Sequence, residues 1–145
     1  MKTAAQILSS KSSQAIHTIA PSASVYDAVK LMAEKNIGAL LVREGEEIAG
    51  IITERDYARK IILLGRASKD TLVREVMTSE VMYVRPNQTS EEMMALMTEN
   101  RIRHLPVMDG GKLIGLISIG DLVKDIISDQ RFIIDQLEQY IRGDR

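Results

Sequence analysis

The chain has 145 residues, a length that suits one compact domain or two small interlocked ones. Its net charge of -1 argues against the strongly basic surface that nucleic acids and anionic membranes attract. The chain contains no cysteine, which excludes disulfides and thiolate metal sites. No apolar run approaches the roughly 18 residues of a membrane span, and the N-terminus turns polar too early for a signal peptide. We therefore expect a soluble, cytoplasmic protein.

A shift of 65 residues places one stretch of the sequence over another without a gap, so that residues 19–62 align with residues 84–127. The matched positions include apolar residues, turn glycines and one acid: Leu40 with Leu105, Gly50 with Gly115, and Asp56 with Asp121. Because these different features coincide over the whole stretch, we interpret the chain as a tandem duplication.

Each repeat predicts the order strand, helix, strand, strand, helix. The first strand is expected at residues 17–19 and 82–84, and the first helix follows capping boxes that begin at Ser24 and Thr89. Two short strands joined by a glycine-containing turn are expected next, at residues 39–42 and 48–52 in the first repeat and at residues 104–107 and 113–117 in the second.

The last helix of each repeat is expected to start near Thr53 or Ser118, and Gly65 is a suitable C-terminal cap for the first. A short leader precedes each repeat, since residues 4–8 resemble residues 73–77, and the extra residues after the first leader predict a flexible loop over residues 9–13. The chain ends in a further predicted helix with one broad apolar stripe, formed by Phe132, Ile133, Leu137, Tyr140 and Ile141.

The order of these motifs resembles the CBS (cystathionine-β-synthase) domain family. The resemblance rests on the segments IGALLV and IRHLPV, the turn glycine, and the segments GIITERD and GLISIGD, over residues 4–127. Two copies in one chain resemble the CBS pair called a Bateman module. This implies an α/β (α+β) fold of two β-α-β-β-α repeats related by a pseudo-twofold axis, with a C-terminal helix. The predicted division is 1–65, 66–127 and a tail at 128–145.

Two motifs, Thr53-x-x-Asp56 and Ser118-x-x-Asp121, stand where a strand runs into a helix. A helix N-terminus offers unpaired N–H groups and partial positive charge to a phosphate. An ionised Asp can accept both hydroxyls of a ribose. The same spacing is also a common capping box, so a purely structural role is the alternative. The resemblance implies that these four residues contact a nucleotide, whereas the boxes of the two earlier helices are caps.

Arg103 and His104 form a second candidate group, because a phosphate needs cationic donors and arginine offers two in a planar fork. The alternative is a solvated strand edge. The first repeat has Gly38 and Ala39 at these positions, so the two sites cannot be chemically equal.

In the family, each site takes its Asp from one repeat and its base pocket from the other. The resemblance therefore implies two sets of ligand-binding residues. The Asp56 set is Thr53, Arg55, Asp56, Tyr83, Ile102, Arg103 and His104. The Asp121 set is Ser118, Gly120, Asp121, Thr18, Ile37, Gly38 and Ala39. We expect the Asp56 site to bind phosphate better, because its cations are more numerous.

No catalytic motif is recognised, since the histidines lack metal-ligand spacing and neither a serine elbow nor a phosphate-loop lysine occurs. We expect no metal and no catalytic cofactor. The expected protein is a non-catalytic sensor of AMP, ADP, ATP or NAD, with S-adenosylmethionine also possible. It would act as a homodimer on a regulated partner protein, without nucleic acid or membrane. The alternatives are a structural dimerisation or interaction module with empty clefts and, as the third, a residual enzyme.

Overall fold

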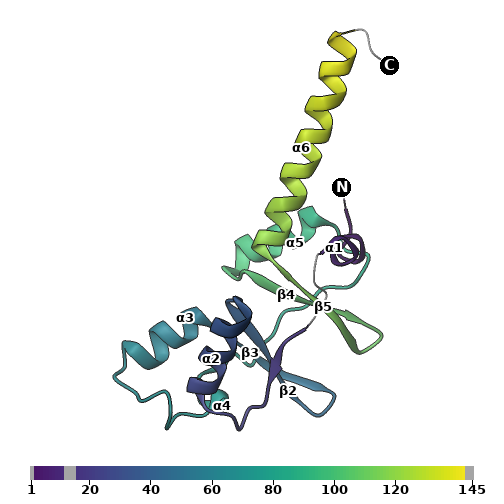
Figure 1. Cartoon of the computed structure of the whole chain (residues 1–145). Helices are drawn as coiled ribbons and strands as arrows, with labels where there is room; N and C mark the ends of the chain where they lie inside the picture. Colours follow the sequence, from purple (N-terminus) through teal and green to yellow (C-terminus); the bar gives the residue numbers. More distant parts are fainter. Residues whose placement is uncertain (1, 12–15, 143–145) are drawn as a thin grey trace. The chain divides into compact units, whose positions relative to one another are not determined.

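The computed structural model describes residues 2–11 and 16–142. The chain divides into two compact units (Figure 1): unit 1 comprises Met1–Ala15 and Met82–Arg145, and unit 2 comprises Ile16–Val81. Each unit contains the strands and helices of one repeat, and a long helix ends the chain. The predicted mixed α/β fold of two repeats with a C-terminal helix is confirmed.

Unit 2 is built on a three-stranded sheet with the order β1-β2-β3, in which β1 runs parallel to β2 and β2 antiparallel to β3. Apolar residues of α2 and of the sheet close its core, and eight of the nine core residues are exposed by 1% or less. Its elements are β1 (Thr18–Ile19), α2 (Val25–Lys35), β2 (Ala39–Glu44), β3 (Glu47–Thr53), α3 (Glu54–Tyr57), the π-helical segment η1 (Ala58–Ile62) and α4 (Val73–Val76).

Unit 1 repeats this plan with the antiparallel pair β4-β5 and a core of its own. The hairpins of the two units even share an irregularity, because the register shifts between Val42 and Arg43 and again between Val107 and Met108. The elements of unit 1 are α1 (Ala4–Ser10), α5 (Ser90–Asn100), β4 (His104–Asp109), β5 (Lys112–Ser118) and α6 (Ile119–Ile141).

The strand predicted at residues 82–84 is reduced to a single bridge between Val84 and Val107. In unit 2 the equivalent strand pairs two residues, and one of these pairs joins Thr18 to Leu41. Pro106 stands at the position equivalent to Leu41 and has no N–H to donate. The second repeat therefore has a shorter ladder than the first.

The predicted helix starts are confirmed. The side chains of Ser24, Thr53, Thr89 and Ser118 each accept a hydrogen bond from the N–H three residues later. Gly65 follows η1 with a φ of 65°, a left-handed conformation that favours glycine. The flexible loop predicted over residues 9–13 is wrong for its first two residues, which belong to α1; residues 12–15 lie outside the described residues.

Each leader packs on the repeat that it does not directly precede in the sequence. α1 precedes the first repeat but packs on β5 of the second, and α4 precedes the second repeat but packs on β3 of the first. The spatial units therefore differ from the division at 1–65, 66–127 and 128–145, which follows the repeats along the sequence. The equivalent leader residues Ala4 and Ile7, and Val73 and Val76, are all buried and belong to the two cores.

A glycine in the last strand of each unit makes room for the leader. A Cβ on Gly50 would lie 2.7 Å from the carbonyl oxygen of Thr78, and a Cβ on Gly115 would lie 2.5 Å from a methyl of Leu8. Thr78 is also held by two backbone hydrogen bonds to Ile51, each of 2.9 Å. The obstacle is therefore fixed backbone in unit 2 and a flexible side chain in unit 1.

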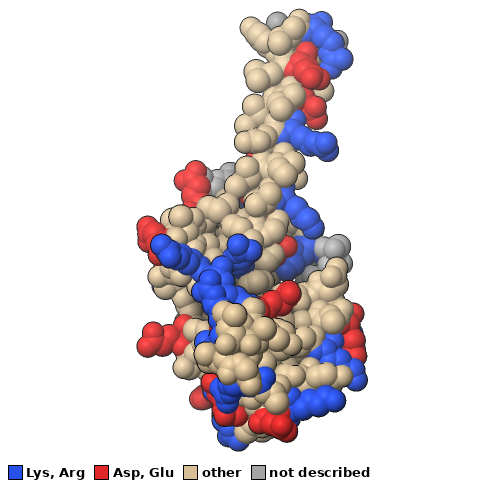
Figure 2. All heavy atoms as spheres, turned by 90° about the vertical axis from the view of Figure 1, so that its left-hand side faces the viewer, with Lys and Arg blue, Asp and Glu red and all other residues tan. Residues whose placement is uncertain are grey.

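α6 joins two predicted helices into one. The last helix of the second repeat continues without a break into the predicted tail helix, over 23 residues. Its C-terminal half extends away from the strands of unit 1 (Figure 1), and in Figure 2 that half shows uncharged atoms on one side and charged atoms on the other. In the part of the chain that the structure describes, no helix has the length and apolarity needed to cross a membrane.

We predict that Gly50→Ala lowers the free energy of unfolding by about 1–3 kcal/mol, the usual cost of overpacking. Gly115→Ala should cost less, because Leu8 can change rotamer. Gly120→Ala is the control, since its Cβ would meet only the Ser118 hydroxyl at an ordinary 3.6 Å and alanine favours a helix. Urea unfolding of the three variants measures the order of their losses in the free energy of unfolding. An equal loss for Gly50→Ala and Gly120→Ala would contradict the packing argument.

Candidate functional site

The strand-to-helix junction of unit 2 is closed by a reciprocal pair of hydrogen bonds. The N–H of Asp56 donates to the Thr53 hydroxyl oxygen at 3.2 Å, and the N–H of Thr53 donates to Asp56 Oδ2 at 3.0 Å. The Thr53 hydroxyl also donates to Oδ2 at 3.2 Å. Asp56 is 8% exposed, so this carboxylate is fixed in place beneath the first turn of α3.

Lys60 completes the environment of Asp56. Its Nζ lies 3.1 Å from Asp56 Oδ1 and donates a 2.8 Å hydrogen bond to the carbonyl oxygen of Val76, the last residue of α4. The ammonium therefore connects the carboxylate to the leader. Sequence analysis did not single out Lys60, although its spacing of four residues from Asp56 is a readable signal for an ion pair on a helix.

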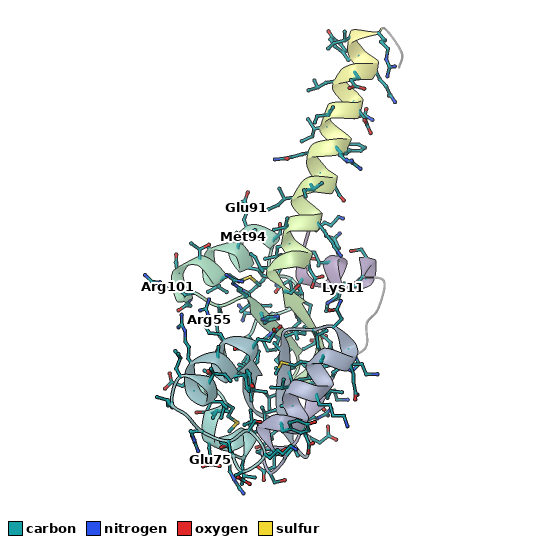
Figure 3. All side chains as sticks on the ribbon, turned by 60° about the vertical axis from the view of Figure 1, so that its left-hand side comes forward. Lys11, Arg55, Glu75, Glu91, Met94 and Arg101 are labelled. Carbon is teal, nitrogen blue, oxygen red and sulfur yellow. The ribbon has the colours of Figure 1, made fainter. Side chains whose placement is uncertain are left out.

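Unit 1 has the same junction with a different source of positive charge. The N–H of Asp121 donates to the Ser118 hydroxyl oxygen at 3.2 Å, and the N–H of Ser118 donates to Asp121 Oδ2 at 2.9 Å. Lys11 Nζ lies 3.0 Å from the same Oδ2 and donates to the carbonyl oxygen of Leu116 at 2.8 Å. Figure 3 labels Lys11, which follows directly after α1.

At one equivalent position the two units carry residues of opposite charge. Asp125 stands at the place that Lys60 occupies in the first repeat, so α6 cannot supply the lysine from within. Lys11, the residue after α1, supplies it instead, while Lys2 Nζ lies 3.1 Å from the buried Asp125 Oδ1. Lys11 was missed because its partner lies 110 residues away along the chain, and no local pattern predicts such a contact.

Burial alone would raise the pKa of Asp121. The hydrogen bond from the Ser118 N–H and the neighbouring Lys11 ammonium outweigh that effect and lower the pKa below its ordinary value. The carboxylate of Asp121 is therefore ionised at neutral pH and over part of the acidic range. An ionised carboxylate is the form that can accept two hydroxyl groups.

The structure brings Arg103 and His104 to the junction of their own unit. The Ile119 N–H donates to the Arg103 carbonyl oxygen at 2.8 Å, and His104 is the strand partner of Ser118. Burial lowers the pKa of His104; the Asp121 charge raises it, whereas the charges of Arg103 and Lys11 lower it further. The net pKa is below the ordinary histidine value, so His104 is neutral at neutral pH.

The equivalent positions of unit 2 are small. The Glu54 N–H donates to the Gly38 carbonyl oxygen at 3.1 Å, and Ala39 is the strand partner of Thr53. A Cβ on Gly38 would lie 2.8 Å from Glu54 Oε1, so the Glu54 side chain lies directly against Gly38. Within each unit, the two junctions therefore differ in the size and charge of the residues at these positions.

The other predicted residues take their places within one unit each. Thr18 is in β1, Ile37 precedes β2, and Arg55 lies in α3, where Figure 3 labels it. Tyr83 and Ile102 lie in unit 1, Tyr83 with 57% of its surface exposed, and Gly120 is in the first turn of α6. The sharing of each site between the two repeats, with Asp56 next to Arg103 and His104, stays a prediction.

The arrangement offers two fixed carboxylates, each held by a helix N-terminus and one lysine. Acceptor oxygens beside a cation suit a ligand that carries both hydroxyl groups and an anion. Among residues 2–11 and 16–142, no three His, Asp or Glu side chains gather closely enough to hold a metal ion.

Comparison with known proteins identifies the family of the chain. A family model described as CBS domain matches residues 5–63 and again 73–128. The chain is 49% identical over 125 residues to the mitochondrial CBS domain-containing protein CBSX3 of Arabidopsis thaliana, a match that covers 83% of this chain and 61% of that protein. The chain thus spans about three fifths of that relative.

Two solved structures share the fold. A signal-transduction protein with CBS domains from Burkholderia ambifaria MC40-6 superposes with a TM-score of 0.86 at 64% identity, covering 89% of this chain and 96% of that one. CBSX2, solved in complex with AMP, superposes with a TM-score of 0.72 at 25% identity, covering 88% and 98%.

Fold and junctions together define a tandem-repeat α/β module with one carboxylate at each strand-to-helix junction. The chain belongs to the CBS-domain family, and it carries two copies of the domain.

We predict that Lys11→Met raises the pKa of His104. Removing the ammonium takes away one charge that opposes protonation and leaves the Asp121 charge, which favours it. The chain has two histidines, so NMR titration of the ring protons resolves each, and His104→Gln assigns the signals. Lys2→Met, which changes a lysine paired with Asp125 instead, is the control. A His104 titration unchanged by Lys11→Met would contradict the charge cluster.

The same lowered pKa values have a consequence for stability. A folded-state pKa below the unfolded one means that the unfolded chain binds more protons, so the free energy of unfolding falls as the pH falls. As the pH falls, the stability contributed by the lowered pKa of His104 is lost first, beginning near the ordinary titration range of histidine. The stability contributed by Asp121 is lost at more acidic pH. Urea unfolding at a series of pH values should show this first decrease in the free energy of unfolding for the wild type, and a smaller decrease for His104→Gln. An identical pH profile for the two proteins would contradict it.

Proposed function

We propose that the protein is a regulatory module that binds an adenine nucleotide, AMP, ADP, ATP or NAD, and performs no catalysis. The observation that carries the proposal is the fixed carboxylate at each junction, beside a helix N-terminus and a lysine. A ribose diol can bind such a carboxylate, and a phosphate can bind the adjacent donors.

The comparisons support the ligand class. A relative of the same fold has been solved with AMP, and another is described as a signal-transduction protein. A non-catalytic role agrees with relatives that carry the names of CBS-domain proteins. Homodimerisation, a regulated partner protein and a cytoplasmic location belong to the same proposal.

The structural module is the second candidate, and one observation favours it. Each Asp already accepts hydrogen bonds from its own helix cap and pairs with a lysine, so the junctions are satisfied without a ligand. On this hypothesis the two Asp carboxylates only close their capping boxes, as the Glu92 carboxylate does when it accepts from the Thr89 hydroxyl at 3.3 Å. A substitution that keeps the cap and removes the charge separates the two hypotheses.

We predict that Asp56→Asn and Asp121→Asn each weaken nucleotide binding by about ten- to a hundred-fold, as expected for one charge-assisted hydrogen bond. The oxygen of an asparagine amide can still accept the N–H bond of Thr53 or Ser118, so the capping box is retained while the charge is removed. Asp27→Asn, in the box of α2, is the matched control. Calorimetric titration with AMP, ADP, ATP, NAD and S-adenosylmethionine measures the affinities, with the larger loss for phosphate-rich ligands expected in Asp56→Asn.

Two outcomes would overturn the sensor hypothesis. Absence of heat and of any thermal shift with all five ligands would leave the structural module. Equal affinities in the two junction variants and in Asp27→Asn would place the ligand elsewhere. Chromatography of the nucleotide after incubation tests the absence of catalysis, because any hydrolysis or phosphoryl transfer by the pure protein would make it an enzyme.

A further inference from the structure

The C-terminal ends of the two leaders are attached to their strands by different chemical groups. In unit 2 the Ile51 carbonyl oxygen accepts the N–H of Thr78 at 2.9 Å, and the Ile51 N–H donates to the Thr78 carbonyl oxygen at the same distance. In unit 1 the equivalent carbonyl belongs to Leu116, and it accepts a 2.8 Å hydrogen bond from Lys11 Nζ. A side-chain ammonium therefore takes the place that a backbone N–H has in the other unit.

The starts of the two leaders, in contrast, are attached alike. The Ala4 N–H at the start of α1 donates to the carbonyl oxygen of Gln88 at 2.8 Å. The Val73 N–H at the start of α4 donates to the carbonyl oxygen of Ala23, the residue equivalent to Gln88, also at 2.8 Å. Backbone hydrogen bonds thus hold α4 at both of its ends, whereas the end of α1 is held by the side chain of Lys11.

The ammonium that holds the end of α1 also belongs to the candidate site. Lys11 Nζ lies 3.0 Å from Asp121 Oδ2, the oxygen that accepts the Ser118 N–H at 2.9 Å. The attachment of α1 to β5 and the occupancy of this carboxylate therefore depend on one group. In unit 2 the two roles are separate, because Lys60 pairs with the carboxylate and Thr78 binds the strand.

We propose that Lys11 is a ligand-sensitive anchor: a nucleotide bound at Asp121 displaces the Lys11 ammonium and so releases the C-terminal end of α1 from β5. The inference rests on the proposed function, which supplies the nucleotide. A ribose diol that donates to both carboxylate oxygens competes with the ammonium for Oδ2, and a phosphate attracts the displaced ammonium. Both effects draw Lys11 away from the Leu116 carbonyl, while the start of α1 stays attached through Ala4.

The two leaders respond differently on this mechanism. A ligand at Asp56 that displaces Lys60 removes one side-chain hydrogen bond to the carbonyl oxygen of Val76. The backbone hydrogen bonds between Ile51 and Thr78 remain, so α4 stays attached to β3. Release of a leader is therefore a property of unit 1, and α4 is the internal control for α1.

The rate at which a buried thiol reacts measures how often its segment opens. The chain contains no cysteine, so a single introduced thiol reports on its own position. Ile7→Cys places a thiol in α1 where the residue is 2% exposed, and Val76→Cys places one at the equivalent position of α4, where the residue is 1% exposed. Labelling of the two variants compares the opening of the two leaders.

Without any ligand, adding Lys11→Met should speed the labelling of Ile7→Cys about tenfold or more, as expected for the loss of a charge-assisted hydrogen bond. The labelling of Val76→Cys should not change. Lys60→Met is the matched control, and it should affect the labelling of Val76→Cys less than Lys11→Met affects that of Ile7→Cys. Unchanged labelling of Ile7→Cys in the Lys11→Met background, or equal effects of the two lysine substitutions on their own leaders, would overturn the proposal.

Saturating AMP should speed the labelling of Ile7→Cys and not that of Val76→Cys. A ligand that only stabilises the folded chain slows labelling at both positions, so the two mechanisms predict opposite signs at position 7. Calorimetry on the same samples shows whether AMP binds. Binding that slows the labelling of Ile7→Cys would overturn the release of α1. Absence of binding would overturn the proposed function together with the release, and the comparison of Lys11→Met with Lys60→Met would then still decide whether Lys11 anchors α1.

Amide hydrogen exchange gives a reading that needs no introduced thiol. The amides of residues 8–10 at the end of α1 should exchange faster in Lys11→Met than in the wild type, and faster in the wild type with AMP than without it. The amides of residues 76–78, at the end of α4, should not exchange faster in either comparison. Slower or unchanged exchange at residues 8–10 with AMP bound would overturn the proposal.

Discussion

The close approach of a leader to the last strand of each unit is the constraint on which the rest depends. Gly50 and Gly115 leave no side chain at the point where Met77 and Leu8 press against the strands. The leaders in turn fill the cores, since Ala4 and Val73 are fully buried. Because each leader comes from the sequence ahead of the other repeat, this packing also joins segments that a simple division into repeats would separate.

The same leaders reach the candidate carboxylates. In unit 2, Lys60 bridges Asp56 and the carbonyl oxygen of Val76 in α4; in unit 1, Lys11 extends from the end of α1 to Asp121. A ligand that takes an oxygen of either Asp competes with an ammonium that belongs to or contacts a leader. Binding at a junction would therefore change the restraints on a segment that also holds the core. If the protein is a sensor, this connection would let a bound ligand alter the packing of a leader. If it is a structural module, the same contacts satisfy the two helix caps without a ligand.

Features set by neighbouring residues could be predicted from the sequence, and features set by distant contacts could not. The Ser24 and Thr53 caps, the hairpins and the turn at Gly65 depend on a few adjacent residues, and all were predicted. The exchange of the leaders, the Lys11 contact and the shortened ladder at Pro106 depend on which segments meet in space. The shortened ladder could have been predicted from the repeat, because the shift of 65 residues aligns Pro106 with Leu41. The junction residues were found, but their lysines were not.

α6 connects the Asp121 junction to a row of exposed apolar side chains. Its N-cap is Ser118 and its first turn holds Asp121, while its exposed apolar residues continue to Ile141 without a break in the helix. A helix of 23 residues carries a rotation of its first turn to its last. A change at the Asp121 junction would therefore also turn the exposed apolar residues farther along α6. The reverse also follows, because a coupling between two binding events is reciprocal: a partner bound to the exposed part of α6 would restrain the first turn and with it the Asp121 carboxylate.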